Sequence, residues 1–559
     1  MRIRITFAKT EAMRYTGHLD LQRAWERTFR RARLPLAYSQ GFHPQARLNL
    51  ACALPLGFTS QCELLDAWLE TSLQMNDILS ALVRAAPPGI EITHLEEITE
   101  RLPALQTQVT SAEFVVTLLD AFPDLADRLV ELGESVPREM PSFRLGGKGT
   151  PFTDPRLFDA RSYPPELFAR PKEKRANREA LGRWGAWVNA LGAKEYGQPL
   201  FLASSADLAG STNIAGFGAA FGDFKGYGWY ERHGSAEGAL LPQEITEFAN
   251  SGIMTGLATV NLSANPQEEF RGFWGISSTY GSFSYLLYGM LRLYSQLAQD
   301  CDLKLGKVVF VAGHSGPETA DDSRTHFGIF APGVTQLFPK GQIINLHPWE
   351  FNEVPVLLAA ALQRDVPVVA LHLTRPPVEI PDREALGIPS HFEAARGAYV
   401  VLNADRERPE GGTVIVQGTS AMAAIVRLLP DLKALNVKVV CATSPQLFDA
   451  QPESYRMQVL SEAERLDSTV ITTQARWLMH DWLYTKIGEE YALSSDWDDR
   501  WRTGGTLEDI LEQAHLTPQH ILDGVRRFVD ERPRRLARLG SAGGPEPERR
   551  ARTQEKHPS

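Results

Sequence analysis

One carboxylate, Glu247, begins a run of apolar and small residues, 248–258, in which a helix is predicted. A carboxyl group held in apolar surroundings can keep its proton near neutral pH and then serve as an acid. Side chains suited to ring stacking and proton transfer follow downstream: Tyr280, Phe283, His314 and His326. Their types and order predict a site for acid–base chemistry centred on Glu247.

Each of these residues also has a purely structural interpretation. The helix dipole favours a glutamate near a helix N-terminus, and aromatic residues at helical spacing usually belong to a core. Lone histidines are commonly hydrogen-bonded core residues. The position of His314 favours the catalytic interpretation, because it follows a predicted buried strand, 308–312. Open α/β sheets bind ligands beyond the carboxyl ends of their strands.

The elements that would position these residues alternate between strand and helix. Short apolar runs predict strands at 200–204, 308–312, 342–347 and 366–373, and helices are predicted at 282–300 and 352–363. Such alternation predicts a parallel sheet with helices on both faces, here over residues 199–390. A second α/β unit is predicted over 391–530, with strands at 399–402, 413–417, 437–442 and 468–473.

The first 118 residues predict a separate α+β domain, with strands at 2–7, 48–54, 62–69 and 109–119 and helices at 21–33 and 75–86. Residues 119–198 are predicted to be a linker and a lead-in helix that begins at Arg178, and residues 531–559 a disordered tail. The expected fold class is multidomain: an α+β N-terminal domain followed by two α/β domains with mostly parallel sheets.

Positive charge is concentrated at the start of the first domain. Residues 1–47 hold ten Lys and Arg side chains against three Asp and Glu. This pattern is typical of a domain that binds an anionic partner such as RNA or a phosphate-bearing molecule, and the alternative is a solvated helix face. The whole chain has a net charge of −10, which does not favour a protein that binds nucleic acid over its entire surface.

Composition indicates a globular cytoplasmic protein. The chain is 43% hydrophobic and 23% charged, which is ordinary for this class, and no apolar run reaches the length of a membrane span. Its four cysteines lack metal-ligand spacing and are expected to be reduced thiols: Cys52, Cys62, Cys301 and Cys441. We therefore expect no metal site within this chain.

An ordered set of motifs from about residue 120 to 530 resembles the transketolase family. The set comprises Ser205-Ala-Asp-Leu208 with Ser211, the helix that begins at Glu247, Thr279-Tyr280-Gly-Ser-Phe283, Gly313-His314-Ser315, Thr325-His326, His347-Pro-Trp-Glu-Phe-Asn-Glu353 and Leu373-Thr374-Arg375. The resemblance implies the pyrimidine-binding domain of that family over 199–390 and its C-terminal domain over 391–530.

The resemblance also implies a cofactor and a reaction. The cofactor would be thiamine diphosphate, and the reaction a transfer of a two-carbon ketol unit between sugar phosphates in carbohydrate metabolism, catalysed by a dimer. Glu247 would contact the aminopyrimidine, Phe283 and Tyr280 would pack on it, and His314 and His326 would be catalytic. The sugar phosphate would contact a further set: Arg178, Ser211, Asp322, His326 and Arg375.

Two departures from the family limit what can be carried over. Thr246 and Phe248 replace an arginine and a histidine that flank the family's glutamate, so the sugars can differ, and a pyruvate dehydrogenase-like reaction is a weaker alternative. The GDG…N element that holds the diphosphate and Mg²⁺ is missing. The resemblance therefore implies that a homo-oligomer or a separate diphosphate-binding subunit completes the site and carries the Mg²⁺.

Residues 1–118 resemble a different family, the radical-SAM-linked domains. The motifs are Arg14-Tyr-Thr-Gly-His18-Leu-Asp20, Tyr38-Ser-Gln-Gly-Phe-His43-Pro44 and Ala53-Leu-Pro-Leu-Gly57. The resemblance implies a radical-SAM protein as a partner. Two alternatives to an enzyme remain: a non-catalytic binding protein linked to a radical-SAM or RNA partner, and a chimeric gene product joined near residue 119.

Overall fold

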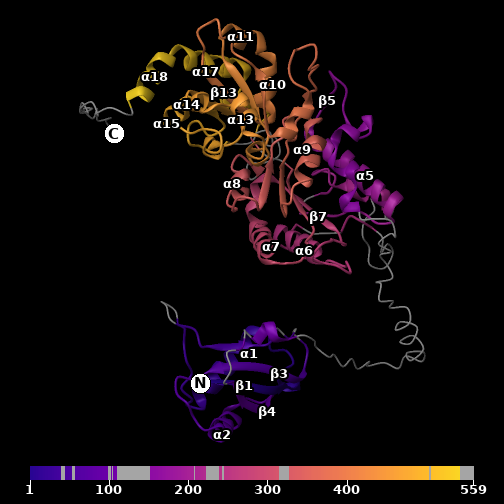
Figure 1. Ribbon diagram of the computed structural model, residues 1–559, viewed down its shortest axis with the longest axis vertical. Coiled ribbons are helices and arrows are strands. Elements are labelled where there is room, and N and C mark those ends of the chain that lie inside the picture. The colour runs from indigo at the N-terminus through magenta and orange to yellow at the C-terminus, as the bar shows by residue number, and fades with distance from the viewer. Residues whose placement is uncertain are drawn as a thin grey trace. The chain divides into compact units, whose positions relative to one another are not determined.

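The computed structural model describes residues 1–39, 44–52, 54, 57–98, 102, 105–109, 151–206, 208–221, 238–241, 245–313, 316, 326–502 and 505–541. Contacts within the chain divide it into two compact units, Met1–Val130 and Glu131–Ser559 (Figure 1). The first unit holds one antiparallel sheet, and the second holds two larger sheets. This arrangement confirms the predicted fold class.

The first unit has the βαββαβ order of a ferredoxin-like fold. Its elements are β1 (Arg2–Lys9), α1 (His18–Arg31), β2 (Leu48–Leu50), β3 (Ser60–Trp68), α2 (Met75–Ala85) and β4 (Ile90–Glu97). The strands lie in the order β2-β3-β1-β4. Alternate residues of β1 are buried, so Ile3, Ile5 and Phe7 enter a core that also holds Trp25 and Phe29 of α1.

The fourth strand of this sheet differs from the prediction. Strand β4 covers Ile90–Glu97 and pairs with β1, whereas the sequence predicts a strand at 109–119. Val109 lies outside any strand, and residues 110–119 are outside the described part of the chain. The sequence of β4, Ile-Glu-Ile-Thr-His-Leu-Glu-Glu, is rich in exposed charge because it is an edge strand, and this charge hides its strand character.

The first sheet of the second unit is entirely parallel, in the order β6-β7-β8-β10-β9. Its strands are β6 (Phe201–Ser205), β7 (Trp274–Thr279), β8 (Val308–Ala312), β9 (Ile343–Leu346) and β10 (Val368–His372). The helices of this region are α5 (Asn177–Tyr196), α6 (Glu247–Thr259), α7 (Tyr288–Asp300), α8 (Ala331–Thr335) and α9 (Glu353–Leu362). All five residues of β8 are buried, as its apolar sequence predicts.

Two details of this sheet differ from the predictions. A helix is predicted at 248–258, and α6 begins at Glu247 and continues to Thr259, but the strand that follows it, β7, is not among the predicted strands. The predicted helix at 282–300 is a 3₁₀ turn, Gly281–Leu286, followed by α7.

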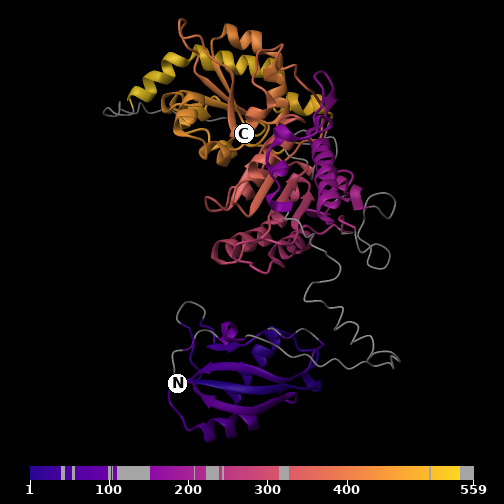
Figure 2. The ribbon, with the colours of Figure 1, turned by 45° about the vertical axis from the view of Figure 1, so that its right-hand side comes forward.

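The second sheet is mixed, in the order β12-β14-β13-β15-β16, and only β12 runs antiparallel (orange to yellow in Figure 2). Its strands are β12 (Ala398–Leu402), β13 (Thr413–Gln417), β14 (Lys438–Ala442), β15 (Ser468–Thr472) and β16 (Leu493–Ser494). Its helices are α10 (Thr419–Arg427), α11 (Leu429–Ala434), α12 (Pro445–Asp449), α13 (Glu453–Val459), α14 (Glu462–Leu466), α15 (Lys486–Glu489), α16 (Leu507–Gln513), α17 (Pro518–Asp530) and α18 (Arg532–Ser541). The unit also contains a small helix, α4 (Pro155–Phe158), and a short pair, β5 (Lys174–Arg175) with β11 (Val378–Glu379).

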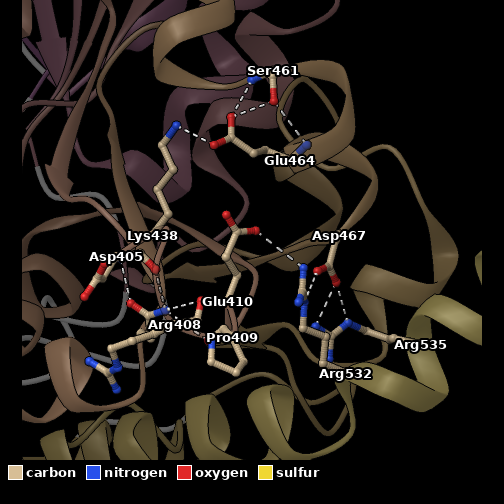
Figure 3. Close-up of polar contacts among 11 residues, drawn as sticks. Asp405, Arg408, Pro409, Glu410, Lys438, Ser461, Glu464, Asp467, Arg532 and Arg535 are labelled. Carbon is tan, nitrogen blue, oxygen red and sulfur yellow. Dashed lines mark hydrogen bonds and ion pairs between the residues drawn. The ribbon is translucent and has the colours of Figure 1, made fainter.

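Helix α18 corrects the prediction that the chain is disordered from residue 531. Arg532 and Arg535 both donate to the carboxylate of Asp467, at 2.6 and 2.8 Å (Figure 3). Arg535 is buried, and its guanidinium lies over the Phe528 ring, 3.6 Å from the centroid. These charge-assisted contacts hold a helix whose arginine-rich sequence alone indicates solvent exposure. Residues 542–559 lie outside the described part.

A buried charged network joins the two sheets of the second unit. Arg383 donates to Glu350 at 2.9 Å and to Glu353 at 3.0 Å, and the Tyr399 hydroxyl donates to the same Glu353 oxygen at 2.6 Å. Glu353 begins α9 beside the first sheet, whereas Tyr399 lies in β12 of the second. The network therefore links the element that follows β9 to the edge of the neighbouring sheet.

Candidate functional site

Glu247 is the first residue of α6 and lies beside the carboxyl end of β7. Its residue is only 7% exposed, and its Oε1 accepts a hydrogen bond of 3.0 Å from the hydroxyl of Thr279, the last residue of β7. Within the described ranges, its second carboxyl oxygen has no hydrogen-bond partner and no cationic side chain pairs with it. One oxygen is thus fixed, and the other is available to a ligand.

The rings of Tyr280 and Phe283 both pack against the ring of His326. The His326 ring meets the Tyr280 ring edge to face at a centroid distance of 4.5 Å, and the Phe283 ring at 5.4 Å. Tyr280 follows Thr279 directly, so the hydroxyl that holds Glu247 and the rings that hold His326 come from one segment. This segment leaves β7 and enters the 3₁₀ turn Gly281–Leu286.

Ser211 links this aromatic group to Arg178. Its hydroxyl lies 3.3 Å from the Tyr280 hydroxyl, and its carbonyl oxygen accepts a hydrogen bond of 2.8 Å from Nη1 of Arg178. Arg178 belongs to the first turn of α5. The structure therefore brings together Arg178, Ser211, Tyr280, Phe283 and His326, which the sequence places up to 148 residues apart, 326 − 178.

Asn177 is a positioning residue that the sequence does not reveal. Its side chain accepts a hydrogen bond of 2.8 Å from the backbone N–H of Thr374 and donates to the Pro348 carbonyl at 2.9 Å. Arg178 and Arg375 are the next residues along the chain from Asn177 and Thr374. The buried amide of Asn177 therefore keeps the two arginines on neighbouring segments, which suits recognition of a phosphate.

Three buried hydroxyls support the same edge of the sheet. Ser205, Thr212 and Ser278 lie within 2.9–3.0 Å of one another. They join the ends of β6 and β7 to the segment that carries Ser211, because hydroxyls can donate and accept at once. Only the Ser205 motif hints at this cluster in the sequence.

Some predicted residues do not enter this geometry. His314 and Asp322 lie outside the described residues, so their roles remain predictions. Phe248, adjacent to Glu247, is exposed, as are Ile245 and Tyr285.

A stacked histidine pair lies at the ends of β9 and β10. The rings of His347 and His372 are 4.6 Å apart and nearly parallel. The Thr335 hydroxyl donates to the Pro332 carbonyl, so it accepts from Nε2 of His372 at 3.3 Å. Burial lowers the pKa of His347 to about 3, and burial and then the neighbouring His347 lower the pKa of His372 well below its ordinary value. Both rings are therefore neutral in the folded protein.

Replacing His372 by asparagine is expected to weaken the acid sensitivity of folding. Below the ordinary histidine pKa, near 6.5, the unfolded chain binds a proton that the folded chain excludes, so acidification destabilises the wild type. As pH falls from roughly 6 to 4.5, the free energy of unfolding of the variant should decrease by about 1.4 kcal/mol less per pH unit than that of the wild type. Urea denaturation across this range measures the slope. His480→Asn, at a half-exposed histidine, is the control, and equal slopes in both variants would contradict the assignment.

Comparisons with known proteins found two kinds of similarity. Residues 2–137 match a family described as "Uncharacterized protein conserved in bacteria (DUF2344)". Part of the chain is similar to transketolases. The chain is 27% identical to the transketolase of Aquifex aeolicus over 266 residues, and 27% identical to that of Geobacillus stearothermophilus over 281 residues. These matches cover 47% and 50% of this chain, but only 34% and 37% of the two relatives.

A solved structure supports the same fold. The transketolase from Leishmania mexicana aligns with a TM-score of 0.50 and 17% identity, over 73% of this chain and 52% of its own. Transketolase-like homology at low identity thus covers about half of the chain, and the chain spans roughly a third of its curated relatives.

Two further features are absent from the described ranges. No helix there has both the length and the apolar composition needed to cross a membrane. No group of three or more His, Cys, Asp or Glu side chains there is arranged to hold a metal ion.

Proposed function

We propose that this protein is the pyrimidine-binding half of a thiamine-diphosphate-dependent transketolase-like enzyme, which transfers a two-carbon ketol unit between sugar phosphates. The observation that carries the proposal is Glu247. Its carboxyl group is buried at the start of α6, one oxygen is fixed by Thr279, and the other has no partner among the described residues. When protonated, this oxygen can donate a hydrogen bond to a ring nitrogen of an aminopyrimidine.

The other residues fit the same cofactor. Tyr280 and Phe283 would pack against its aminopyrimidine ring, since Tyr280 directly follows Thr279, whose hydroxyl holds Glu247. When bound, thiamine diphosphate supplies a nucleophilic thiazolium carbon for the transfer. Glu247 would hold a proton toward the pyrimidine, and His326 would exchange a proton with the sugar, together with His314. Arg178, Ser211 and Arg375, with Asp322, would bind the sugar phosphate.

The proposal includes a surface of this chain that would contact a second polypeptide. Helices α6 and α7 expose large apolar side chains: Phe248, Ile253, Leu293 and Leu297. Contiguous exposed apolar groups of this kind mark interaction surfaces. The relatives contain roughly twice to three times the length that this chain matches. We therefore assign this surface to a diphosphate-binding chain, which would also carry the Mg²⁺.

Calorimetry with thiamine diphosphate and Mg²⁺ tests the proposal, first on this chain alone and then with a candidate diphosphate-binding chain. Saturable binding and transfer from a ketose phosphate to an aldose phosphate are expected only for the mixture. Leu293→Asp should prevent the two chains from associating on a sizing column, and Val83→Asp, at an exposed residue of α2, should not. Failure of every mixture to bind the cofactor and transfer the two-carbon unit would reject the proposed function.

A further inference from the structure

Helix α1 of the first unit carries a row of exposed arginines. Arg23, Arg27, Arg30 and Arg31 are spaced at i, i+4, i+7 and i+8, so they lie on one face of the helix. At a rise of about 1.5 Å per residue, the Cα atoms of Arg23, Arg27 and Arg30 are about 6 and 4.5 Å apart along the axis, and Arg31 follows Arg30 directly. The opposite face is buried, since Leu21, Trp25 and Phe29 enter the core.

Most of this positive charge is uncompensated. Arg27 and Arg30 have no ion pair with any described residue, and Arg23 has only an exposed pair with Asp20 at 3.3 Å. The arginines of β1 contrast with them, because Arg2 and Arg4 both bind the fully buried carboxylate of Asp66. Charges that stabilise the fold are therefore paired, whereas those of α1 face solvent.

Arg33 extends the row in a conformation that favours glycine. Its φ is +56°, in the left-handed region, and the Leu34 N–H donates back to the Phe29 carbonyl, as in the turn that commonly ends a helix. Glycine at this position would avoid the strain of about 1 kcal/mol that a side chain costs. An arginine here adds a fifth exposed guanidinium to the same end of the helix.

A hollow lies beside this end of the row. It measures about 390 Å³, and its walls come from the carboxyl-terminal parts of α1 and α2. Two guanidiniums, of Arg31 and Arg84, face it, and the rest of its lining is alanine and proline, including Pro87 and Pro88. Since no carboxylate lines the hollow, it fits an anion that also has a flat apolar part.

We propose that this face of the first unit binds single-stranded RNA. The arginine row would contact successive phosphates, and the hollow would receive an unstacked base against arginine and proline surfaces. A double helix does not offer such a base. A membrane surface is disfavoured because the apolar side of α1 is buried in the core and cannot enter a bilayer.

Fluorescence anisotropy of the full chain with a labelled 12-nucleotide single-stranded RNA tests this proposal. Arg27→Gln with Arg30→Gln should weaken binding by roughly tenfold and reduce the salt dependence of log K by about 1.4, which is about 0.7 per phosphate contact. Arg31→Gln with Arg84→Gln should reduce the preference for the single strand over a duplex of equal length.

The matched control is Arg406→Gln with Arg500→Gln, two exposed arginines of the second unit, which should leave RNA binding unchanged. Circular dichroism confirms that each variant is folded. An equal loss of RNA affinity in the Arg406→Gln, Arg500→Gln control would overturn the proposal. The absence of saturable RNA binding by the wild type in about 50 mM salt would also overturn it. Tighter binding to duplex DNA or to anionic phospholipid vesicles than to the RNA would overturn it as well.

Discussion

Replacing Glu247 by glutamine is expected to abolish two-carbon transfer by the reconstituted protein without altering the fold. The amide is the same size as the carboxyl group, and its oxygen can still accept the hydrogen bond from Thr279. It cannot hold and release a proton. The rate should therefore fall by about 10²–10⁴-fold, the usual contribution of a positioned acid or base. Initial rates and the thermal unfolding midpoint of the same samples measure the two effects.

Two further variants separate chemistry from structure. Thr279→Val removes the hydroxyl that orients Glu247, so a smaller loss of rate is expected, with binding of the sugar unchanged. Glu268→Gln changes an exposed glutamate of the same unit and should have no effect on rate. A Glu247→Gln protein with more than about a tenth of wild-type activity would show that Glu247 is not the acid.

Local sequence pattern predicted the buried strands well and the polar ones poorly. Val308–Ala312 is a run of apolar, mostly β-branched residues, and it forms β8 with both faces covered. Strand β7 is equally buried, but its sequence, Trp-Gly-Ile-Ser-Ser-Thr, lacks such a run. Ser278 is hydrogen-bonded to the hydroxyls of Ser205 in β6 and of Thr212 in the segment that follows β6, and these partners are invisible to a local pattern.

The residues of the candidate site also divide into those that the sequence predicts and those that it does not. Glu247, Tyr280, Phe283 and Ser211 could be selected from the sequence because their motifs resemble a family. Asn177 could not be selected in this way, and the motif that contains Thr279 does not reveal its bond to Glu247, since both roles depend on hydrogen bonds across the fold. The bond from the Thr374 N–H to Asn177 joins residues 197 positions apart. Only the fold of the second unit brings the start of α5 and the segment after β10 together.

Replacing Arg383 by methionine is expected to produce a large loss of stability. Arg383 is nearly buried and bridges Glu350 and Glu353, both of which are fully buried. Removing it leaves two carboxylates next to each other without a cation, and breaking a buried pair in this way costs about 3–5 kcal/mol. Urea denaturation at pH 7.5 measures the free energy of unfolding. Arg396→Met, which removes a half-exposed arginine paired with Glu393, is the control and should cost less than about 1 kcal/mol.

The pH dependence of the Arg383→Met protein identifies the cause of that loss. In the wild type, burial raises the pKa of Glu353 to about 7. The positive charge of Arg383 lowers this pKa, and the negative charge of Glu350 offsets part of that lowering. A carboxyl group whose pKa is higher in the folded than in the unfolded chain binds its proton more tightly when folded, so its contribution to stability grows as pH falls toward about 4.5. Without Arg383 the pKa rises further. The difference in the free energy of unfolding between the wild type and Arg383→Met should therefore become smaller from pH 7.5 to 5.5. Adding Glu350→Gln and Glu353→Gln to Arg383→Met should remove this pH dependence. A gap that stays constant with pH would mean that lost packing, rather than unpaired charge, destabilises the protein.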